Sequence, residues 1–294
     1  MIDTNLKATA FFAMIIGGLL IAFSPIFMRF SLNISDVSPS AAAFWRVSLA
    51  LPILFLLMVW QKKSLTFARP KNFLNKDFFL IGLFFAGDLA FWHWSIAYTT
   101  VANATLLANL ASSFTAIIGY FFFKERFSRT FIGGLVLAII GAITLMGHSL
   151  EASPENFKGD ILGILTALCY ASYIIATNKA RKRWSTLDLM FYSGVFTALL
   201  LFPVGLLEDK AFTPEVLLNW WPLLSLSWVS HLLGQSMIMY GLAHISATLG
   251  SVSLLIQPVI ATLLAALIFD EQLVIYHLTG GVMILTGIYI CKKG

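Results

Sequence analysis

Residues 97–146 read AYTTVANATLLANLASSFTAIIGYFFFKERFSRTFIGGLVLAIIGAITLM, which is an apolar segment, a short charged break and a second apolar segment. Residues 243–290 repeat this plan as AHISATLGSVSLLIQPVIATLLAALIFDEQLVIYHLTGGVMILTGIYI. An offset of 146 positions brings Ala97 onto Ala243, Phe123 onto Phe269, Glu125 onto Glu271, Gly134 onto Gly280 and Gly141 onto Gly287. The chain is therefore expected to consist of two related halves, 1–150 and 151–294.

The composition indicates an integral membrane protein with little mass outside the bilayer. Of the 294 residues, 59% are hydrophobic and 11% are charged, whereas soluble domains carry about 25% charged residues. The apolar residues form segments of about twenty, the length of a helix that crosses the hydrocarbon layer. We read the net charge of +5 as loop charge set by membrane topology, and we expect no nucleic-acid partner.

Ten membrane spans are predicted from these segments. They lie at about 9–31, 38–60, 77–97, 101–123, 130–148, 159–179, 187–207, 219–243, 247–269 and 273–291. Each half then contains five spans. Because five is odd, the second half begins on the opposite side of the membrane, and its orientation is inverted relative to the first. The predicted fold class is an all-α membrane protein of ten transmembrane helices, built as two inverted five-helix repeats.

The basic residues orient this arrangement in the membrane. If the N-terminus is inside, the predicted external loops keep only Lys158 and Lys210, and nearly all other Lys and Arg residues outside the spans fall in cytoplasmic segments. The charged break is basic in the first half (KER, 124–126) and acidic in the second (DEQ, 270–272). Because Lys and Arg are retained on the cytoplasmic side, both termini are expected in the cytoplasm of a bacterial cell, with the protein in the inner membrane.

Three formal charges are predicted to lie inside spans, at Arg29, Arg46 and Asp88. Ionisable residues within a span are costly, and they usually face a cavity or a partner. Arg29 lies near the outer end of its span, where it acts either as an interfacial anchor or as a functional charge. Arg46 and Asp88 lie deeper and at similar depths. They are expected either to form a structural ion pair or to hold opposite ends of a zwitterion.

Four other spans carry narrow polar stripes at helical spacing, and lipid would reject such stripes. We assign the strongly polar residue near the middle of each stripe to a substrate cavity, and we attribute the Ser, Thr and Gly members to helix packing. A tryptophan one turn from Asp88 suits a substrate that carries an ammonium group. The predicted substrate-binding residues are Arg46, Asp88, Trp92, Asn109, Tyr170, His231 and Gln257.

Spans five and ten carry glycines and no strongly polar residue near their middle. The glycines are Gly133, Gly134 and Gly141 in span five, and Gly280, Gly281 and Gly287 in span ten. These two spans are expected to form a packing scaffold or the surface of a homodimer. Prolines inside other spans, at Pro25, Pro52, Pro203 and Pro258, permit bends that alternating access can use.

These residues resemble the EamA-type branch of the drug/metabolite transporter superfamily over nearly the whole chain. The resemblance is carried by FFFKERFSRTFIGG (121–134) with LIFDEQLVIYHLTGG (267–281), by Phe44-Trp45-Arg46 and by Gln257-Pro258. The first half has Ala111-Ser112 where many members show a proline. The resemblance implies export of amino acids or other small metabolites, uptake in some members, and no cofactor.

The leading hypothesis is a secondary active transporter that exports an amino acid or a related small polar metabolite by alternating access. Arg46 would hold a carboxylate, and Asp88 would hold an ammonium group or the coupling proton. An uptake carrier for another small metabolite or a drug-like cation is the alternative. An intramembrane enzyme is disfavoured because H-E-x-x-H and G-x-S-x-G motifs are absent from the sequence. A channel or lipid scramblase does not need inverted halves.

Overall fold

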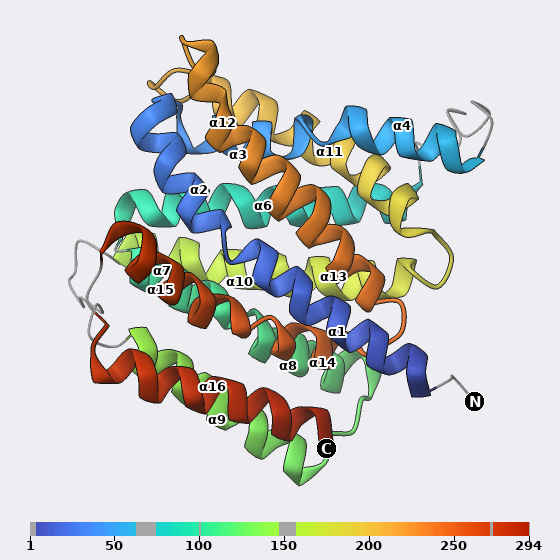
Figure 1. The fold of residues 1–294 in the computed structure, drawn as a ribbon. Coiled ribbons are helices and arrows are strands. Elements are labelled where there is room, and N and C mark those ends of the chain that lie inside the picture. The colour runs from blue at the N-terminus through green and yellow to red at the C-terminus, as the bar shows by residue number, and fades with distance from the viewer. Residues whose placement is uncertain (1–3, 63–74, 100, 147–156, 271–272, 294) are drawn as a thin grey trace.

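A computed structural model describes residues 4–62, 75–99, 101–146, 157–270 and 273–293. In these ranges the regular elements are helices, and the long ones lie side by side in one bundle (Figure 1). The segment between the second and third predicted spans (61–76) and the segment between the fifth and sixth (149–158) fall largely outside the described residues, and Glu271 falls outside them entirely.

Seven helical segments within the described ranges are long and apolar enough to cross a membrane. They are Leu6–Ser35, Pro39–Gln61, Lys76–Ile96, Phe157–Ala180, Thr186–Leu206, Ala247–Phe269 and Ile275–Lys293. The predicted spans 101–123 and 130–148 overlap the shorter apolar helices Leu107–Phe123 and Arg129–Leu145. The predicted span 219–243 is a chain of short helices that runs along the first helix. This architecture is that of a multi-pass membrane protein.

Short breaks divide several of these segments into consecutive helices. The first segment contains α1 (Thr4–Ile21), α2 (Ser24–Phe30) and η1 (Ser31–Ser35), and the second contains α3 (Pro39–Ser48) and α4 (Leu51–Lys62). They are followed by α6 (Lys76–Tyr98), α7 (Val101–Asn109), α8 (Ala111–Phe123), α9 (Arg129–Met146), α10 (Phe157–Ala180) and α11 (Thr186–Leu206). The remaining helices are η5 (Leu217–Trp220), α12 (Trp221–Ser225), η6 (Leu226–Gln235), α13 (Ser236–Gly241), α14 (Ala247–Ser253), α15 (Ile256–Phe269) and α16 (Ile275–Lys293).

Proline accounts for three of the breaks. Pro25, Pro52 and Pro258 follow the interruptions after α1, α3 and α14 within a few residues. Proline lacks the N–H that the helix ladder needs, and its ring clashes with a preceding carbonyl. The break at Leu110, between α7 and α8, has no proline. There the Ser112 hydroxyl donates to the Asn109 carbonyl at 3.1 Å, so a side chain pairs a carbonyl at the interruption.

Backbone geometry repeats between the two halves. The residue before α8, Leu110, has φ −62° and ψ −8°, and the residue before α15, Leu255, has the same pair of angles. Lys124 ends α8 in the left-handed conformation with φ 55°, and Asp270 ends α15 in that conformation with φ 54°. Lys124 and Asp270 are 146 positions apart, the offset of the sequence repeat.

Helices α9 and α16 pack side by side at one edge of the bundle (Figure 1). A Cβ added at Gly134 would lie 2.8 Å from the Gly287 carbonyl oxygen, and one at Gly280 would lie 2.6 Å from the Gly141 oxygen. The sequence offset carries Gly134 to Gly280 and Gly141 to Gly287, so the two close contacts are copies of each other. This glycine face is therefore used for packing inside the molecule.

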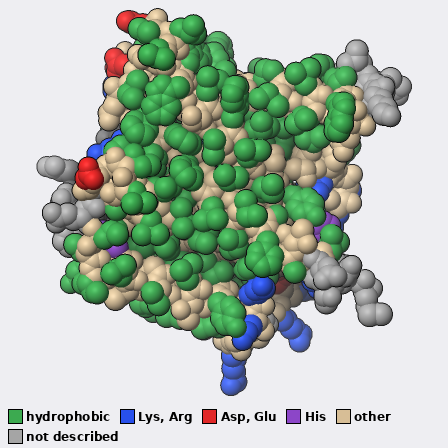
Figure 2. All heavy atoms as spheres, viewed as in Figure 1, with side chains coloured by type: hydrophobic (Ala, Val, Ile, Leu, Met, Phe, Trp, Pro, Cys, Tyr) green, Lys and Arg blue, Asp and Glu red, His purple; other side chains and the backbone are tan. Residues whose placement is uncertain are grey.

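Hydrophobic side chains cover most of the visible surface between the ends of the helices (Figure 2). Large apolar residues on this surface are exposed, for example Phe122 at 77% and Leu267 at 81%. On a protein in water such exposure would promote aggregation. In a bilayer it is the surface that faces lipid, and this matches the composition of the chain.

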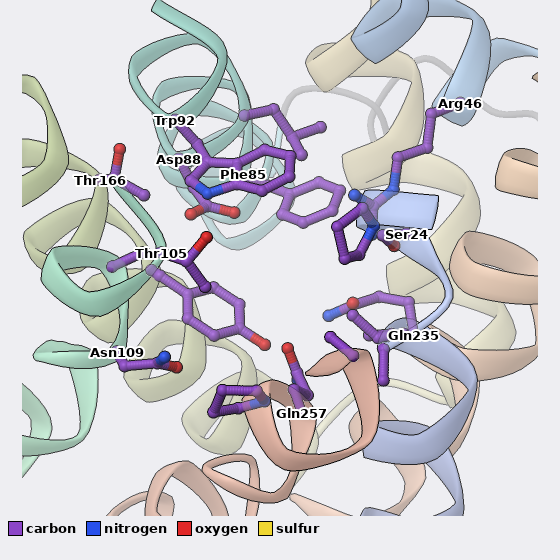
Figure 3. A pocket seen from close by; sticks show the side chains of 18 residues that line it. Ser24, Arg46, Phe85, Asp88, Trp92, Thr105, Asn109, Thr166, Gln235 and Gln257 are labelled. Carbon is purple, nitrogen blue, oxygen red and sulfur yellow. The ribbon is translucent and has the colours of Figure 1, made fainter. Parts of the chain in front are cut away.

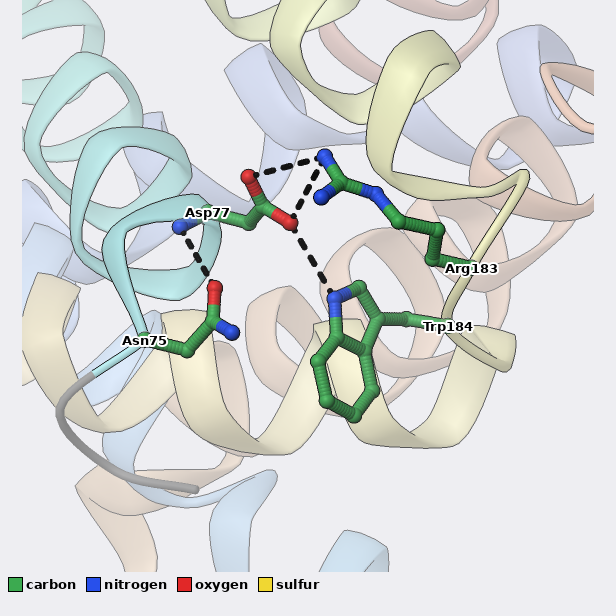
Figure 4. A network of polar contacts seen from close by, with 4 residues as sticks. All are labelled: Asn75, Asp77, Arg183 and Trp184. Atoms are coloured by element: carbon green, nitrogen blue, oxygen red, sulfur yellow. Dashed lines mark hydrogen bonds and ion pairs between the residues drawn. The ribbon is translucent and has the colours of Figure 1, made fainter. Parts of the chain in front are cut away.

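Two ends of the bundle are distinguished by the residues that gather there. We call the first the Lys293 end, because α1 begins and α16 ends there, and Lys292 Nζ lies 4.3 Å from the centre of the Phe11 ring. Asp77 at the start of α6 accepts from Trp184 Nε1 at 3.1 Å and pairs with Arg183 at 3.1 Å (Figure 4). These contacts tie α6 to the connection between α10 and α11.

Residues 207–216, which we call the strap, close over the opposite end, named here the Ser38 end. The Glu208 carboxylate accepts from Ser40 N at 3.1 Å, from the Ser40 hydroxyl, and from Trp94 Nε1 at 3.0 Å. Burial raises the pKa of Glu208, but these donors outweigh it and hold the pKa below the usual value for a glutamate. An ionised Glu208 thus joins the second half of the chain to α3 and α6.

Two backbone carbonyls of the strap add to this connection. The Ala211 oxygen accepts from Ser38 N at 2.9 Å, and the Phe212 oxygen accepts from Trp45 Nε1 at 2.8 Å. The Phe212 ring also lies 5.7 Å from the Trp45 ring. Trp45, the residue before Arg46 in the sequence, therefore holds the strap in place.

We expect Gly280→Ala to destabilise the protein, because the added Cβ would lie 2.5 Å from Leu145 N and 2.6 Å from the Gly141 oxygen. Overpacking of this kind costs about 1–3 kcal/mol. Gly133→Ala is the matched control, since a Cβ there meets nothing within 4 Å. Thermal unfolding in detergent, followed by size-exclusion chromatography, should show a lower midpoint for Gly280→Ala alone. Equal midpoints for the two variants would contradict the packing.

A second expectation concerns Glu208→Gln. Because the folded-state pKa of Glu208 is lowered, its charge stabilises the fold above the ordinary glutamate pKa of about 4.3, and this stabilisation is lost as the pH falls through the lowered value. The variant should therefore unfold at a lower temperature than the wild type at pH 7, with a smaller difference near pH 4. Asp209→Asn, at an exposed neighbour, is the control, and a difference independent of pH would refute the assignment.

Candidate functional site

A cavity of about 130 Å³ lies in the middle of the bundle (Figure 3). Its wall is formed by the break between α1 and α2 and by α3, α6, α7, α10, η6 and α15. A buried water needs about 10–15 Å³ by this measure, so the cavity has room for a ligand of roughly ten heavy atoms. Both halves of the chain contribute to the wall.

Six of the seven predicted substrate-binding residues line this cavity. They are Arg46, Asp88, Trp92, Asn109, Tyr170 and Gln257. The seventh, His231, is not part of the wall. Its ring stacks on the ring of Phe85 at 5.5 Å and 20°, and Phe85 does line the cavity. The structure therefore brings the six residues together and places His231 behind an aromatic ring.

Arg46 and Asp88 face the cavity from different sides (Figure 3). Within the described residues they form neither an ion pair within 4.0 Å nor a hydrogen bond with each other, and Arg46 Nε has no hydrogen-bond partner although the side chain is only 5% exposed. The alternative of a purely structural ion pair is thus not what the structure shows. The two opposite charges thus face the same cavity without pairing, and keeping charges unpaired in a protein interior is costly.

The local structure explains how Arg46 is held there. It lies in the last turn of α3, just before the break at 49–50, where the unpaired carbonyls of a helix end favour a cation. Arg29, the other arginine within the first two segments, does not line the cavity. Its guanidinium lies 4.1 Å from the centre of the Phe269 ring.

Helix breaks bring polar side chains to the cavity. Ser24 is the first residue of α2, Asn109 is the last residue of α7, and Gln257 is the second residue of α15. All three line the cavity, and Ser24 Oγ, Asn109 Nδ2 and Gln257 Nε2 have no partner among the described residues. Interrupted helices around a central cavity are the arrangement that many transporters use for binding.

Aromatic rings form the apolar part of the wall. Phe85, Trp92 and Tyr170 line the cavity, and the Tyr170 ring lies parallel to that of Tyr173 at 5.9 Å and 6°. Gln235 Nε2 donates to the Tyr173 hydroxyl at 2.6 Å, which fixes the second layer of rings. The cavity therefore combines an aromatic surface with single charged and amide groups, as small-molecule sites do.

Several wall residues were not predicted from the sequence. Thr105, Thr166 and Gln235 line the cavity, and each lies four residues from a predicted site residue (Asn109, Tyr170 and His231). Ser24 and Phe85 line it as well. A usable signal existed for two of them, because Ser24 precedes a proline within a span and Phe85 lies one turn from Asp88. Among the described residues, no three His, Cys, Asp or Glu side chains are grouped as metal ligands.

The sequence is similar to a family of membrane transporters. The profile of the EamA-like transporter family matches residues 8–147 and again residues 157–291. A protein of Escherichia coli named "Probable amino-acid metabolite efflux pump" is 28% identical over 240 residues, which are 76% of this chain and 78% of the relative. The pseudopaline exporter CntI of Pseudomonas aeruginosa is 26% identical over 196 residues, 67% of each chain.

Two further comparisons cover more of the chain. An uncharacterized transporter of Archaeoglobus fulgidus is 24% identical over 273 residues, 90% of this chain and 91% of the relative. A crystal structure with 17% sequence identity superposes with a TM-score of 0.81 over 98% of both chains. At that identity the match concerns the fold alone, which a solved protein shares from end to end.

Proposed function

The chain belongs to the EamA-like transporter family, and from this premise we propose that it exports an amino acid or a related small polar metabolite. Family membership and the apolar helices make it an integral multi-pass membrane transport protein. The substrate, the direction and the mechanism are our proposal. The observation that carries it is that two opposite charges, Arg46 and Asp88, line one central cavity without pairing with each other, and that Arg46 Nε has no hydrogen-bond partner among the described residues.

A zwitterion of amino-acid size fits these groups. The Arg46 guanidinium would bind the carboxylate, since its planar fork matches the two carboxylate oxygens. Asp88 would accept from the ammonium group, and Trp92 would offer a ring face to the same cation. Asn109, Tyr170 and Gln257 would bind the remaining polar atoms. The names of two relatives, an amino-acid metabolite efflux pump and a pseudopaline exporter, support export of a small metabolite.

We further infer that the chain crosses the membrane ten times as two inverted halves, 1–150 and 151–294. The repeated angles at Leu110 and Leu255 and the duplicated glycine contacts support a two-fold relation between the halves. Contacts that are exchanged in this way arise from a two-fold axis. The concentration of Lys and Arg at the Lys293 end supports a cytoplasmic location for both termini, in a bacterial inner membrane.

Alternating access requires that contacts between the halves open at one end at a time. At the Ser38 end the strap joins the second half to α3 and α6 through Glu208. At the Lys293 end the Glu125 carboxylate accepts from the Thr248 hydroxyl at 2.8 Å. We propose that these two connections alternate, and that Asp88 either contacts the ammonium group or takes up the coupling proton. The proposal involves no cofactor.

A second candidate is a carrier that imports another small metabolite or a drug-like cation. It is favoured by the presence of one carboxylate, Asp88, beside the aromatic ring of Trp92 on the cavity wall. Such a substrate would not need Arg46. Catalysis by the cavity is not part of either proposal.

Counterflow in proteoliposomes tests the proposal, with vesicles preloaded with amino acids, polyamines and nucleosides. Truncating one partner of a buried charge pair costs about 2–5 kcal/mol, so Arg46→Ala should reduce amino-acid exchange by at least about 30-fold. Arg29→Ala removes a charge away from the cavity and should exchange normally. Exchange of amino acids by a folded Arg46→Ala protein at the wild-type rate would refute the role of Arg46.

Asp88→Asn separates the two roles of the carboxylate in the same assay. If the variant still exchanges amino acids but no longer responds to a pH gradient, Asp88 is the proton site. If it loses exchange as well, Asp88 contacts the substrate. Exchange of only polyamines by the wild type would favour the second candidate. Wild-type behaviour of Asp88→Asn in both respects would exclude Asp88 from the mechanism.

A further inference from the structure

Phe85 lies on the cavity wall one turn before Asp88 in α6, and it is 4% exposed. Two rings that do not line the cavity contact it. The ring of His231 is stacked on it at 5.5 Å, and the ring of Tyr173 lies at 4.9 Å and 31°. Phe85 is therefore the layer between the cavity and a group of residues behind it.

His231 and the helix that carries it hold polar atoms without partners. His231 is 2% exposed, and neither of its ring nitrogens has a hydrogen-bond partner in the described part of the chain. Ser227, four residues earlier in η6, is fully buried, and its hydroxyl also lacks a partner. Each such buried group costs about 1–3 kcal/mol. Three unsatisfied atoms on one helix require an explanation.

The helix that carries them is itself unusual. η6 is a π-helix of 10 residues, whereas π geometry is usually confined to a single turn and is frequent at functional sites. Gln235 at its end lines the cavity and also holds the Tyr173 hydroxyl. The same helix thus contributes to the cavity wall and to the residues behind Phe85.

We propose that Phe85 is a movable partition between the cavity and a polar subsite formed by His231 and Ser227. With the ring in place, Phe85 limits the size of the substrate. When the ring rotates about χ1, the end of a longer substrate side chain reaches His231. A neutral imidazole offers one donor and one acceptor, so the subsite suits a hydroxyl or an amide group. The assignment of this substrate class rests on the proposed transport of amino acids.

Chemical modification tests the partition without reference to any substrate. Diethyl pyrocarbonate would be applied to the full chain in nanodiscs, and modification of each histidine would be followed by peptide mass spectrometry. In Phe85→Ala, His231 should react at least about 10-fold faster than in the wild type. His93, which is equally buried and contacts the Leu89 carbonyl through Nδ1, is the internal reference. Phe84→Ala is the matched control on the same helix. An unchanged rate at His231 would overturn the proposal.

Counterflow with amino acids of increasing side-chain length tests the size limit. One methylene in an apolar pocket is worth about 10–200-fold in discrimination. Phe85→Ala should therefore lower the preference for short over long side chains by at least about 10-fold, with Phe85→Leu intermediate. His231→Ala in the Phe85→Ala background should remove the gain for side chains that end in an amide or hydroxyl.

The two assays separate failure of the subsite from failure of the proposed function. If the wild type exchanges amino acids but Phe85→Ala keeps the same size preference, the partition is wrong and the transport proposal stands. If the wild type exchanges no amino acid, the substrate class is wrong, and the histidine modification alone decides whether Phe85 covers His231.

Discussion

Backbone pairing in a membrane is the constraint on which this structure depends. An N–H or C=O group left unpaired in hydrocarbon costs several kcal/mol, so helices are interrupted only where protein or a water-filled cavity supplies partners. The interruptions before Ser24, after Asn109 and before Gln257 all adjoin the central cavity. Near the first of them, the Ser230 hydroxyl donates to the Leu20 carbonyl at 3.2 Å. The helices are therefore interrupted where the cavity lies, and the interruptions in turn bring polar groups to its wall.

The same constraint explains the electrostatics of the site. A guanidinium and a carboxylate in a low-dielectric interior would lower their energy by pairing, yet Arg46 and Asp88 stand apart on the wall. Each is fixed by its helix, Arg46 at the end of α3 and Asp88 within α6. In the proposed function a zwitterionic ligand compensates both charges, and the stability given up at these positions serves binding, as is common at functional sites.

The membrane-spanning character of the chain and most of the predicted cavity residues follow from the sequence. Embedded charges predict Arg46 and Asp88, the position one helical turn from Asp88 predicts Trp92, and the polar stripes predict Asn109, Tyr170 and Gln257. All six residues line the cavity. Periodicity gives the face of a helix but not what lies across from it. It predicts His231 as a cavity residue, whereas in the structure the His231 ring stacks on Phe85 and does not line the cavity. Phe85 itself looks like any core residue. The break at Leu110 has no proline to announce it, and the Ser112 hydroxyl pairs the Asn109 carbonyl there.

The glycine contacts between α9 and α16 have a consequence for how the protein is made. At Gly134 and Gly287 the backbones of the two helices lie in close contact, because glycine has no side chain between them. Without its partner, each helix exposes bare backbone at these positions. Gly134 and its partner Gly287 are 153 positions apart in the chain, and Gly141 and its partner Gly280 are 139 positions apart. At a synthesis rate of about 5–20 residues per second, α9 waits roughly 7–30 seconds for α16. During that interval its bare backbone stripe lies open to lipid, to the insertion machinery and to the glycine stripes of other nascent chains.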